Sequence, residues 1–271
     1  MLKKIALSLL IAVFAINSGS AQDSEFGLMI GGNYYIGDLN PKEHFYNTKV
    51  AGAMFLRYNF NPRVSVRANL MLGSVEAYDG DSKVKNQKER GLAFASDILE
   101  FSGLLEINFY PYQLGNLETP FTPFVFLGAG IFKFNPTAEY SNKRIDLQPL
   151  GTEGQGTSLN SAEKYNLTAM TLPFGAGFKI NLTQKVGLNI EYGFRKTFTD
   201  YLDDVSTVYV DPTILAEESS QVASIMSDRS KANNVVGAQR GESTATDWYS
   251  FLGIGITIRV GGKRNTCPAW D

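Results

Sequence analysis

Apolar and polar residues alternate along most of the chain, in segments of about ten residues. The clearest segments are 64–73 and 186–195, where an apolar residue occupies nearly every second position. A period of two predicts β-strands with one apolar and one polar face. The polar faces carry Arg, Glu, Lys and Asn in the middle of the strands as well as at their ends. We therefore expect the apolar faces to point outward into lipid and the polar faces to point into a narrow lumen.

Segments of this kind predict eight strands, at 26–36, 50–60, 64–75, 98–109, 122–133, 167–180, 186–196 and 248–260. Short and long connections alternate between them. The short connections are 61–63, 111–120 and 181–185. The long, polar ones are 37–49, 76–97, 134–166 and 197–247. A soluble sandwich gives no reason for this sorting, so the predicted fold is all-β, an eight-stranded antiparallel transmembrane β-barrel with short periplasmic turns and long extracellular loops.

The N-terminal segment has the features of an export signal. Lys3 and Lys4 precede an apolar stretch at 5–16, and Gly19-Ser20-Ala21 forms a small-residue cleavage site. We predict a signal peptide at 1–21, an outer-membrane β-barrel at 22–260 and a periplasmic tail at 261–271. No other stretch approaches the roughly twenty apolar residues of a membrane helix. A membrane-spanning form must therefore use strands closed into a barrel, in the cell outer membrane.

Composition narrows the possible partners. The net charge of -2 and the lack of a basic run give no indication of nucleic-acid binding. The 18 Phe and 13 Tyr suit aromatic girdles at a membrane interface. A single Cys excludes an internal disulfide framework. Because Cys267 lies in the tail, we expect it to contact or form a disulfide with another chain, the alternative being an unpaired thiol.

Strand register predicts a charge cluster in the lumen. If 61–63 is a tight turn, Arg57 lies opposite Arg67, and like charges side by side are unfavourable unless an acid intervenes. Glu106 is expected at their level, with Glu100 higher on the same wall. The full predicted set of lumen ion-pairing residues is Arg57, Arg67, Glu100, Glu106, Glu191 and Arg195. Such a lumen is a plug, because eight strands leave an interior that side chains can fill.

The faces of 122–133 stay ambiguous, because Phe124, Phe126 and Phe132 share a parity with Gly128 and Gly130. Both assignments remain open from the sequence: the rings face either the lumen or the lipid.

Candidate chemistry elsewhere is weak. The only His is His44, whose neighbours form no nucleophile motif, so a surface His is expected. The run 199–204 offers carboxylates for calcium but lacks the ligand spacing of a calcium loop, so a capped, solvated loop is expected. Residues 150–156 lack the Lys-Ser/Thr ending of a phosphate-binding loop and are expected to form an ordered surface turn. Residues 217–241 are expected to be mobile at least in part. We predict no catalytic, cofactor or metal site.

Five segments together resemble the PorG-like barrel family of Bacteroidetes. They are YYIGDLNP at 34–41, RYNFNPR at 57–63, LQPLGTEG at 147–154, RKTFTDYLDDVS at 195–206 and TCP at 266–268. The most specific is 195–206, which marks Asp200, Asp203 and Asp204 as family-motif residues of an external loop. The resemblance covers nearly all of the predicted mature chain.

This resemblance implies an outer-membrane component of the type IX protein secretion machinery. The barrel would anchor a periplasmic ring, made of a lipoprotein and its partner protein, and would not itself be the conduit. Its other partner would be outer-membrane lipid, with the barrel monomeric within the larger assembly. The alternatives are a surface-binding or adhesion barrel acting through 134–166 and 197–247, an outer-leaflet lipid-modifying enzyme using His44, and a small-solute channel.

Overall fold

The computed structural model describes residues 24–230 and 234–260. The predicted signal peptide at 1–21 and the tail at 261–271, with Cys267, lie outside the described residues. Nine strands form: β1 (Ser24–Ile36), β2 (Lys49–Asn59), β3 (Val64–Tyr78), β4 (Ala93–Asn108), β5 (Phe121–Tyr140), β6 (Lys143–Asp146), β7 (Thr168–Asn181), β8 (Val186–Thr197) and β9 (Trp248–Val260). The short helical elements are η1 (Asp79–Asp81), α2 (Lys85–Arg90), η2 (Gln148–Leu150), α3 (Pro212–Glu218) and α4 (Gln221–Ser227).

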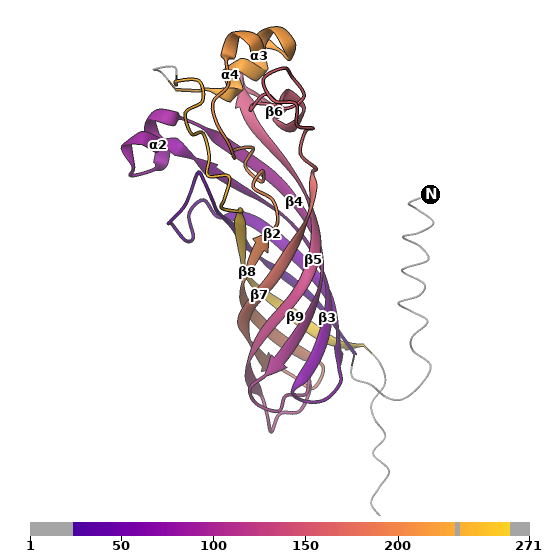
Figure 1. The fold of residues 1–271 in the computed structure, drawn as a ribbon. Helices are drawn as coiled ribbons and strands as arrows, with labels where there is room; N and C mark the ends of the chain where they lie inside the picture. The colour runs from indigo at the N-terminus through magenta and orange to yellow at the C-terminus, as the bar shows by residue number, and fades with distance from the viewer. Residues whose placement is uncertain (1–23, 231–233, 261–271) are drawn as a thin grey trace, which may run out of the picture.

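Eight of the strands close into an antiparallel barrel (Figure 1). Each strand pairs with its neighbour in chain order, β5 pairs with β7, and β9 pairs with β1 to complete the ring. β6 stays outside the ring and forms a hairpin with the end of β5. The predicted eight-stranded barrel is therefore confirmed. None of the helices in the described part of the chain is long and apolar enough to cross a membrane.

Three strands run further than predicted at the end of the barrel that carries the long loops. β3 continues to Tyr78, β4 begins at Ala93 and β5 continues to Tyr140. The hairpin between β5 and β6 turns at Ser141 and Asn142, which have positive φ values of 49° and 60°. In these extensions apolar side chains such as Ala77 and Phe94 face inward and are buried, whereas Asp97 faces outward and is exposed, so the lipid-facing apolar pattern ends. The sequence pattern therefore hid the extensions and the strand β6.

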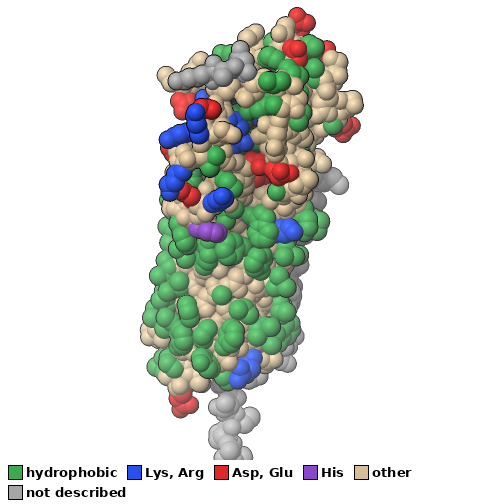
Figure 2. All heavy atoms as spheres, turned by 60° about the vertical axis from the view of Figure 1, so that its left-hand side comes forward, with side chains coloured by type: hydrophobic (Ala, Val, Ile, Leu, Met, Phe, Trp, Pro, Cys, Tyr) green, Lys and Arg blue, Asp and Glu red, His purple; other side chains and the backbone are tan. Residues whose placement is uncertain are grey.

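An apolar belt surrounds the lower part of the barrel, as Figure 2 shows on one face. Its members are exposed large apolar side chains, including Leu28, Ile30, Val50, Met54, Leu72, Leu99, Phe101, Leu105, Leu127, Ile131, Met170, Phe178, Ile254 and Ile256. A soluble domain does not expose so continuous an apolar surface, whereas a transmembrane barrel must. The outer surface is that of an outer-membrane-type barrel.

The ambiguous rings of β5 point into the lumen. Phe124, Phe126 and Phe132 are buried, while Val125, Leu127 and Ile131 face outward. Glycines on the neighbouring strands make room for the rings. A Cβ atom added to Gly177 would lie 2.7 Å from the Phe124 ring, and one added to Gly193 would lie 2.6 Å from the Phe126 ring.

The long connections and the short helices gather at one end of the barrel (Figure 1). We call this end the cap; its described residues are 37–48, 79–92, 141–167, 198–230 and 234–247. The charged side chains visible in Figure 2 concentrate over it. The short turns lie at the opposite end, so the alternation of short and long connections in the sequence corresponds to the two ends of the structure.

Candidate functional site: a packed lumen and an ordered cap

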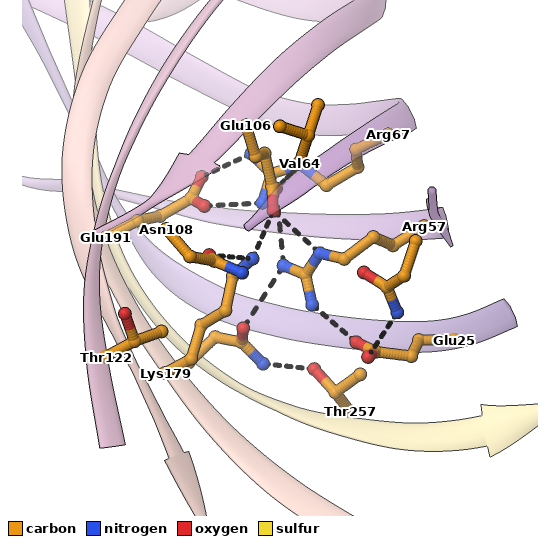
Figure 3. Close-up of polar contacts among 12 residues, drawn as sticks. Glu25, Arg57, Val64, Arg67, Glu106, Asn108, Thr122, Lys179, Glu191 and Thr257 are labelled. Atoms are coloured by element: carbon orange, nitrogen blue, oxygen red, sulfur yellow. Dashed lines mark hydrogen bonds and ion pairs between the residues drawn. The ribbon is translucent and has the colours of Figure 1, made fainter. Parts of the chain in front are cut away.

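The lower lumen is crossed by a network of buried charges centred on Glu106 (Figure 3). Arg57 and Arg67 lie directly opposite each other in the β2–β3 ladder, as predicted. Glu106 Oε2 accepts a hydrogen bond from Arg57 Nε at 2.8 Å, and Glu106 Oε1 lies 3.1 Å from Arg67 Nε. Lys179 on β7 also donates to Glu106 Oε2, at 2.6 Å. One carboxylate therefore faces three cations from three strands.

Two further acids balance this charge. Glu25 on β1 accepts from Arg57 Nη1 at 2.7 Å. Glu191 on β8 accepts from Arg67 Nη1 at 2.6 Å. The Phe55 ring lies under both guanidinium groups, 4.8 Å from Arg57 and 4.9 Å from Arg67. Because cations favour an aromatic face, this ring helps to hold two like charges on neighbouring strands.

A second polar layer lies higher in the lumen. Glu100 pairs with Arg195 at 3.3 Å and accepts hydrogen bonds from the Tyr249 hydroxyl at 2.7 Å and from Ser102 Oγ at 2.6 Å. The structure thus places Glu100 above Glu106 on β4, as predicted, and pairs it with Arg195. Sequence reasoning missed Glu25, Lys179 and Tyr249 as members of these pairs. Glu25 lies outside the predicted strand 26–36, and the inward parity of Lys179 and Tyr249 did not reveal their cross-lumen partners, which depend on the closure of the barrel.

The lumen is filled by these side chains. Arg57, Arg67, Arg195 and Lys179 are among the largest fully buried side chains in the described residues, together with lumenal Phe rings. Charges buried this way are tolerated only when each has a partner of opposite sign and good geometry. A packed and ion-paired lumen leaves the two ends of the barrel as the surfaces that can act on other molecules.

The cap is the second ordered site, and the family-motif segments meet there. Glu153 from 147–154 is 1% exposed, and its Oε1 atom accepts from Arg240 Nη1 at 2.9 Å and from the backbone N–H of Ser206 at 2.9 Å. Thr152 donates to Asp204 Oδ2 at 2.5 Å, and Tyr165 donates to Asp204 Oδ1 at 2.5 Å. Segments 147–154 and 195–206 are therefore packed against each other.

The expected surface turn at 150–156 is wrong in its position. The turn is ordered, with positive φ values at Gly151, Gly154 and Gly156, but residues 151–155 are buried inside the cap. The expected solvated loop at 199–204 is also wrong, since Asp203 and Asp204 are each 1% exposed. Both errors have one cause: charged and glycine-rich segments bury together when they satisfy each other's hydrogen bonds.

Tyr35 connects the cap to the barrel. Its hydroxyl lies 2.5 Å from Asp203 Oδ2 and 2.8 Å from Asp247 Oδ1. A phenol has one proton to donate, so the second contact requires a proton on one of the carboxyls. Burial raises the pKa of Asp203 well above its usual value, and the neighbouring charge of Asp247 adds to this. Burial likewise raises the pKa of Asp247.

The pKa values of the other two motif carboxyls, Asp200 and Asp204, are raised as well. Burial raises the pKa of Asp204 to about 6, against the opposing charge of Arg240. Burial raises the pKa of Asp200 to about 7, with Asp38 and Glu153 adding negative charge. Asp203 and Asp204 are therefore buried and Asp200 is half-buried, and all three lie among other acidic groups. Among the described residues, no Asp, Glu, His and Cys side chains are grouped so as to hold a metal ion.

Residues 217–241 contain more structure than the sequence indicated. Helix α3 is capped by Asp211, whose carboxylate accepts from Thr213 N at 2.8 Å, and α4 is capped by Ser220. Arg240 is 3% exposed and binds the cap core through Glu153. Within 217–241, α4 and Arg240 are therefore held by hydrogen bonds that the polar composition did not indicate, and the expectation of partial mobility stays a prediction for the rest of the segment.

His44 lies at the upper edge of the apolar belt, where Figure 2 shows the only His side chain. Its ring meets Phe194 edge-on at 6.2 Å between centroids. The neighbouring Phe45 packs edge-on against Tyr34 at 5.1 Å, so the first cap loop covers an outward-facing tyrosine. This arrangement is that of an aromatic interface girdle.

Solved structures of small outer-membrane barrels are similar to this chain. Ail of Yersinia pestis, in complex with the heparin analogue sucrose octasulfate, matches with a TM-score of 0.43 and 10% identity over 89% of this chain and 100% of that one. Neisserial surface protein A matches with a TM-score of 0.41 and 10% identity over 88% of this chain and 97% of that one. The N-terminal barrel domain of Pseudomonas aeruginosa OprF matches with a TM-score of 0.35 and 12% identity over 88% of this chain and 99% of that one.

These similarities are too low to bear on function. A comparison with curated proteins gives no match. A family model described as "Domain of unknown function (DUF6089)" matches residues 3–210. That range spans most of the chain, from the predicted signal peptide through the packed motif segments, and the chain therefore belongs to the DUF6089 family.

Proposed function

We propose that this protein is a non-conducting outer-membrane barrel that anchors a protein assembly, and that the assembly is the type IX secretion machinery. The observation that carries the proposal is the packed lumen, in which Glu106 faces Arg57, Arg67 and Lys179. A barrel closed in this way offers its ends and its outer surface to partners. The secretion role is supported by the resemblance of 34–41, 147–154 and 195–206 to the PorG-like family.

In this proposal the barrel is exported through its signal peptide and inserted as a monomer within the larger assembly. Its short turns and its tail face the periplasm, where a ring lipoprotein and its partner protein bind. Cys267 contributes the contact or an intermolecular disulfide. No catalytic step is assigned to the barrel.

The test combines secretion with affinity capture. Deletion of the gene is expected to stop export of type IX cargo, and tagged barrel is expected to capture the ring lipoprotein. Cys267→Ser, and truncation after Val260, are expected to reduce capture while leaving the barrel inserted. Continued cargo export without the barrel contradicts the secretion role, whereas capture that survives both changes contradicts only the role of the tail.

A second candidate function is surface binding through the cap. It is favoured by the burial of Glu153, Asp204 and Arg240, because holding long loops in one arrangement preorganises a binding surface. Shortening 141–167 and 210–245 is then expected to abolish surface binding while cargo export continues. The reverse outcome favours the anchoring role.

A further inference from the structure

A groove of about 1110 Å³ opens in the cap between α2 and the segment 234–242. We call it the cap groove. Its described lining comes from α2 with the adjoining Gly91 and from residues within 229–242, together with Asp38 and Tyr209. The volume is at the upper end of the range for small-molecule sites and allows an oligomeric ligand. It belongs to neither the lumen nor the proposed periplasmic contact.

Tyr209 provides the clearest indication of a ligand. It is 4% exposed, lines the groove, and its hydroxyl has no hydrogen-bond partner among the described residues. Its backbone is fixed on both sides, because Tyr209 N donates to Ala238 O at 2.9 Å and Tyr209 O accepts from Gly237 N at 2.8 Å. A buried hydroxyl without a partner destabilises a fold, so a ligand that bonds to it would remove that cost.

The floor of the groove is rigid and nearly neutral. Arg90 is held by Asp79 through two hydrogen bonds of 2.7 Å and donates to Asp38 O at 3.0 Å. Arg240 is held by Glu153. Each guanidinium is thus matched by a carboxylate before any ligand arrives. The floor therefore presents oriented polar groups and little free charge.

The rim combines donors and acceptors in similar numbers. The rim carries the amides of Asn86, Gln87, Asn234 and Gln239, and an amide can donate and accept at the same time. The Gln87 amide is already bonded to Ser82 and Asp38, and Asn234 Nδ2 donates to Asp228. The rim also carries two acids, Glu89 and Glu242, and three cations, Lys85, Lys88 and Arg229. A polyanion would meet these acids, and an acyl chain or an amphipathic helix would find no large apolar side chain in the described lining apart from the Tyr209 ring. A polyhydroxylated ligand fits, because each hydroxyl is both a donor and an acceptor.

We propose that the cap groove binds a neutral oligosaccharide, with Tyr209 hydrogen-bonded to a sugar hydroxyl. The site does not depend on the secretion role. Intact chain, purified in lauryldimethylamine oxide to avoid sugar detergents, is titrated with maltohexaose, cellohexaose and chitohexaose. Saturable binding of at least one probe, with a Kd at or below about 1 mM, is expected. Failure of all three overturns the proposal, as does tighter binding of dextran sulfate than of every neutral probe.

Tyr209→Phe gives a test with two readouts. Because the hydroxyl has no partner among the described residues, the variant is expected to keep or raise the melting temperature without ligand, while binding the sugar about tenfold more weakly. The matched control is Tyr112→Phe at the opposite end of the barrel, where the hydroxyl donates to Asn181 Oδ1 at 2.9 Å. This control is expected to lose stability and to keep sugar affinity. A lowered melting temperature for Tyr209→Phe, or unchanged sugar affinity, overturns the assignment.

Discussion

Arg57 and Arg67 face each other across the β2–β3 ladder, and both guanidinium groups point at the carboxylate of Glu106. Two arginines at directly opposed positions would repel each other in an ordinary sheet. In this lumen the shared acid and the Phe55 ring between them turn the pair into the centre of the packed network. The arrangement makes Glu106 the residue on which the closed lumen most depends.

Glu106→Gln is expected to destabilise the barrel strongly. The change removes the negative charge that faces Arg57, Arg67 and Lys179 and leaves Glu25 and Glu191 to balance them. Loss of one partner from a buried ion pair costs about 3–5 kcal/mol. The effect is measured as the free energy of unfolding in urea, with unfolding monitored by heat-modifiable gel migration in detergent.

The control for this variant is Glu43→Gln. Glu43 pairs with Lys83 at 2.7 Å on the surface of the cap, with side chains 46% and 87% exposed. Exposed pairs of this kind contribute about 0–1 kcal/mol. Equal effects of the two substitutions would contradict the central role of Glu106.

The lumen is expected to carry no ionic current. Planar bilayers containing the protein should show no resolvable single-channel conductance, because the cross-lumen side chains are packed. The combined substitution Arg57→Ala, Arg67→Ala and Glu106→Ala removes two positive charges and one negative charge and opens the lower layer, although Glu100 and Arg195 still occupy the upper one. Adding Arg195→Ala and Glu100→Ala is expected to give measurable conductance. A wild-type barrel that conducts would show that the network is not a plug.

The sequence predicted the barrel wall better than it predicted the cap. Inward and outward positions follow from parity, which is local, and the tight turn at 61–63 fixed Arg57 opposite Arg67. Phe124 and Phe126 were ambiguous because their direction depends on glycines of neighbouring strands. In the cap, Glu153 and Arg240 are 87 residues apart in the chain, and no local pattern connects them. Their burial follows from tertiary packing that polar composition conceals.

The cap is expected to lose stability as the pH rises from 5 to 8. Because the folded pKa values of Asp204 and Asp200 are raised to about 6 and about 7, the folded state binds protons more tightly than the unfolded chain. Their contribution is complete below the unfolded pKa of about 4 and is lost as the pH rises through the folded values. The expected change is on the order of 2 kcal/mol and comes mainly from the buried Asp204, because solvent screens the half-exposed Asp200. Urea unfolding of the cap at each pH measures it.

Asp203→Asn is expected to flatten this pH dependence. An amide can keep the contact with Tyr35 without a shared proton. The substitution therefore removes one carboxyl whose pKa is raised by folding. Asp146→Asn, at an exposed position in β6, serves as the control and is expected to leave the slope unchanged. A steeper slope in Asp203→Asn would contradict proton sharing at Tyr35.

Arg240→Met is expected to open the cap while leaving the barrel closed. The change leaves Glu153 buried without its cation and removes the hydrogen bond from Arg240 Nη1 to the backbone oxygen of Asp204. A local cost of about 3–5 kcal/mol raises the open population of the cap by two orders of magnitude or more. Limited proteolysis should then cut 210–245 much faster, whereas heat-modifiable migration stays that of the folded barrel. Arg229→Met, at an exposed position in the same segment, is the matched control, and equal cleavage of the two variants would contradict the role of Arg240.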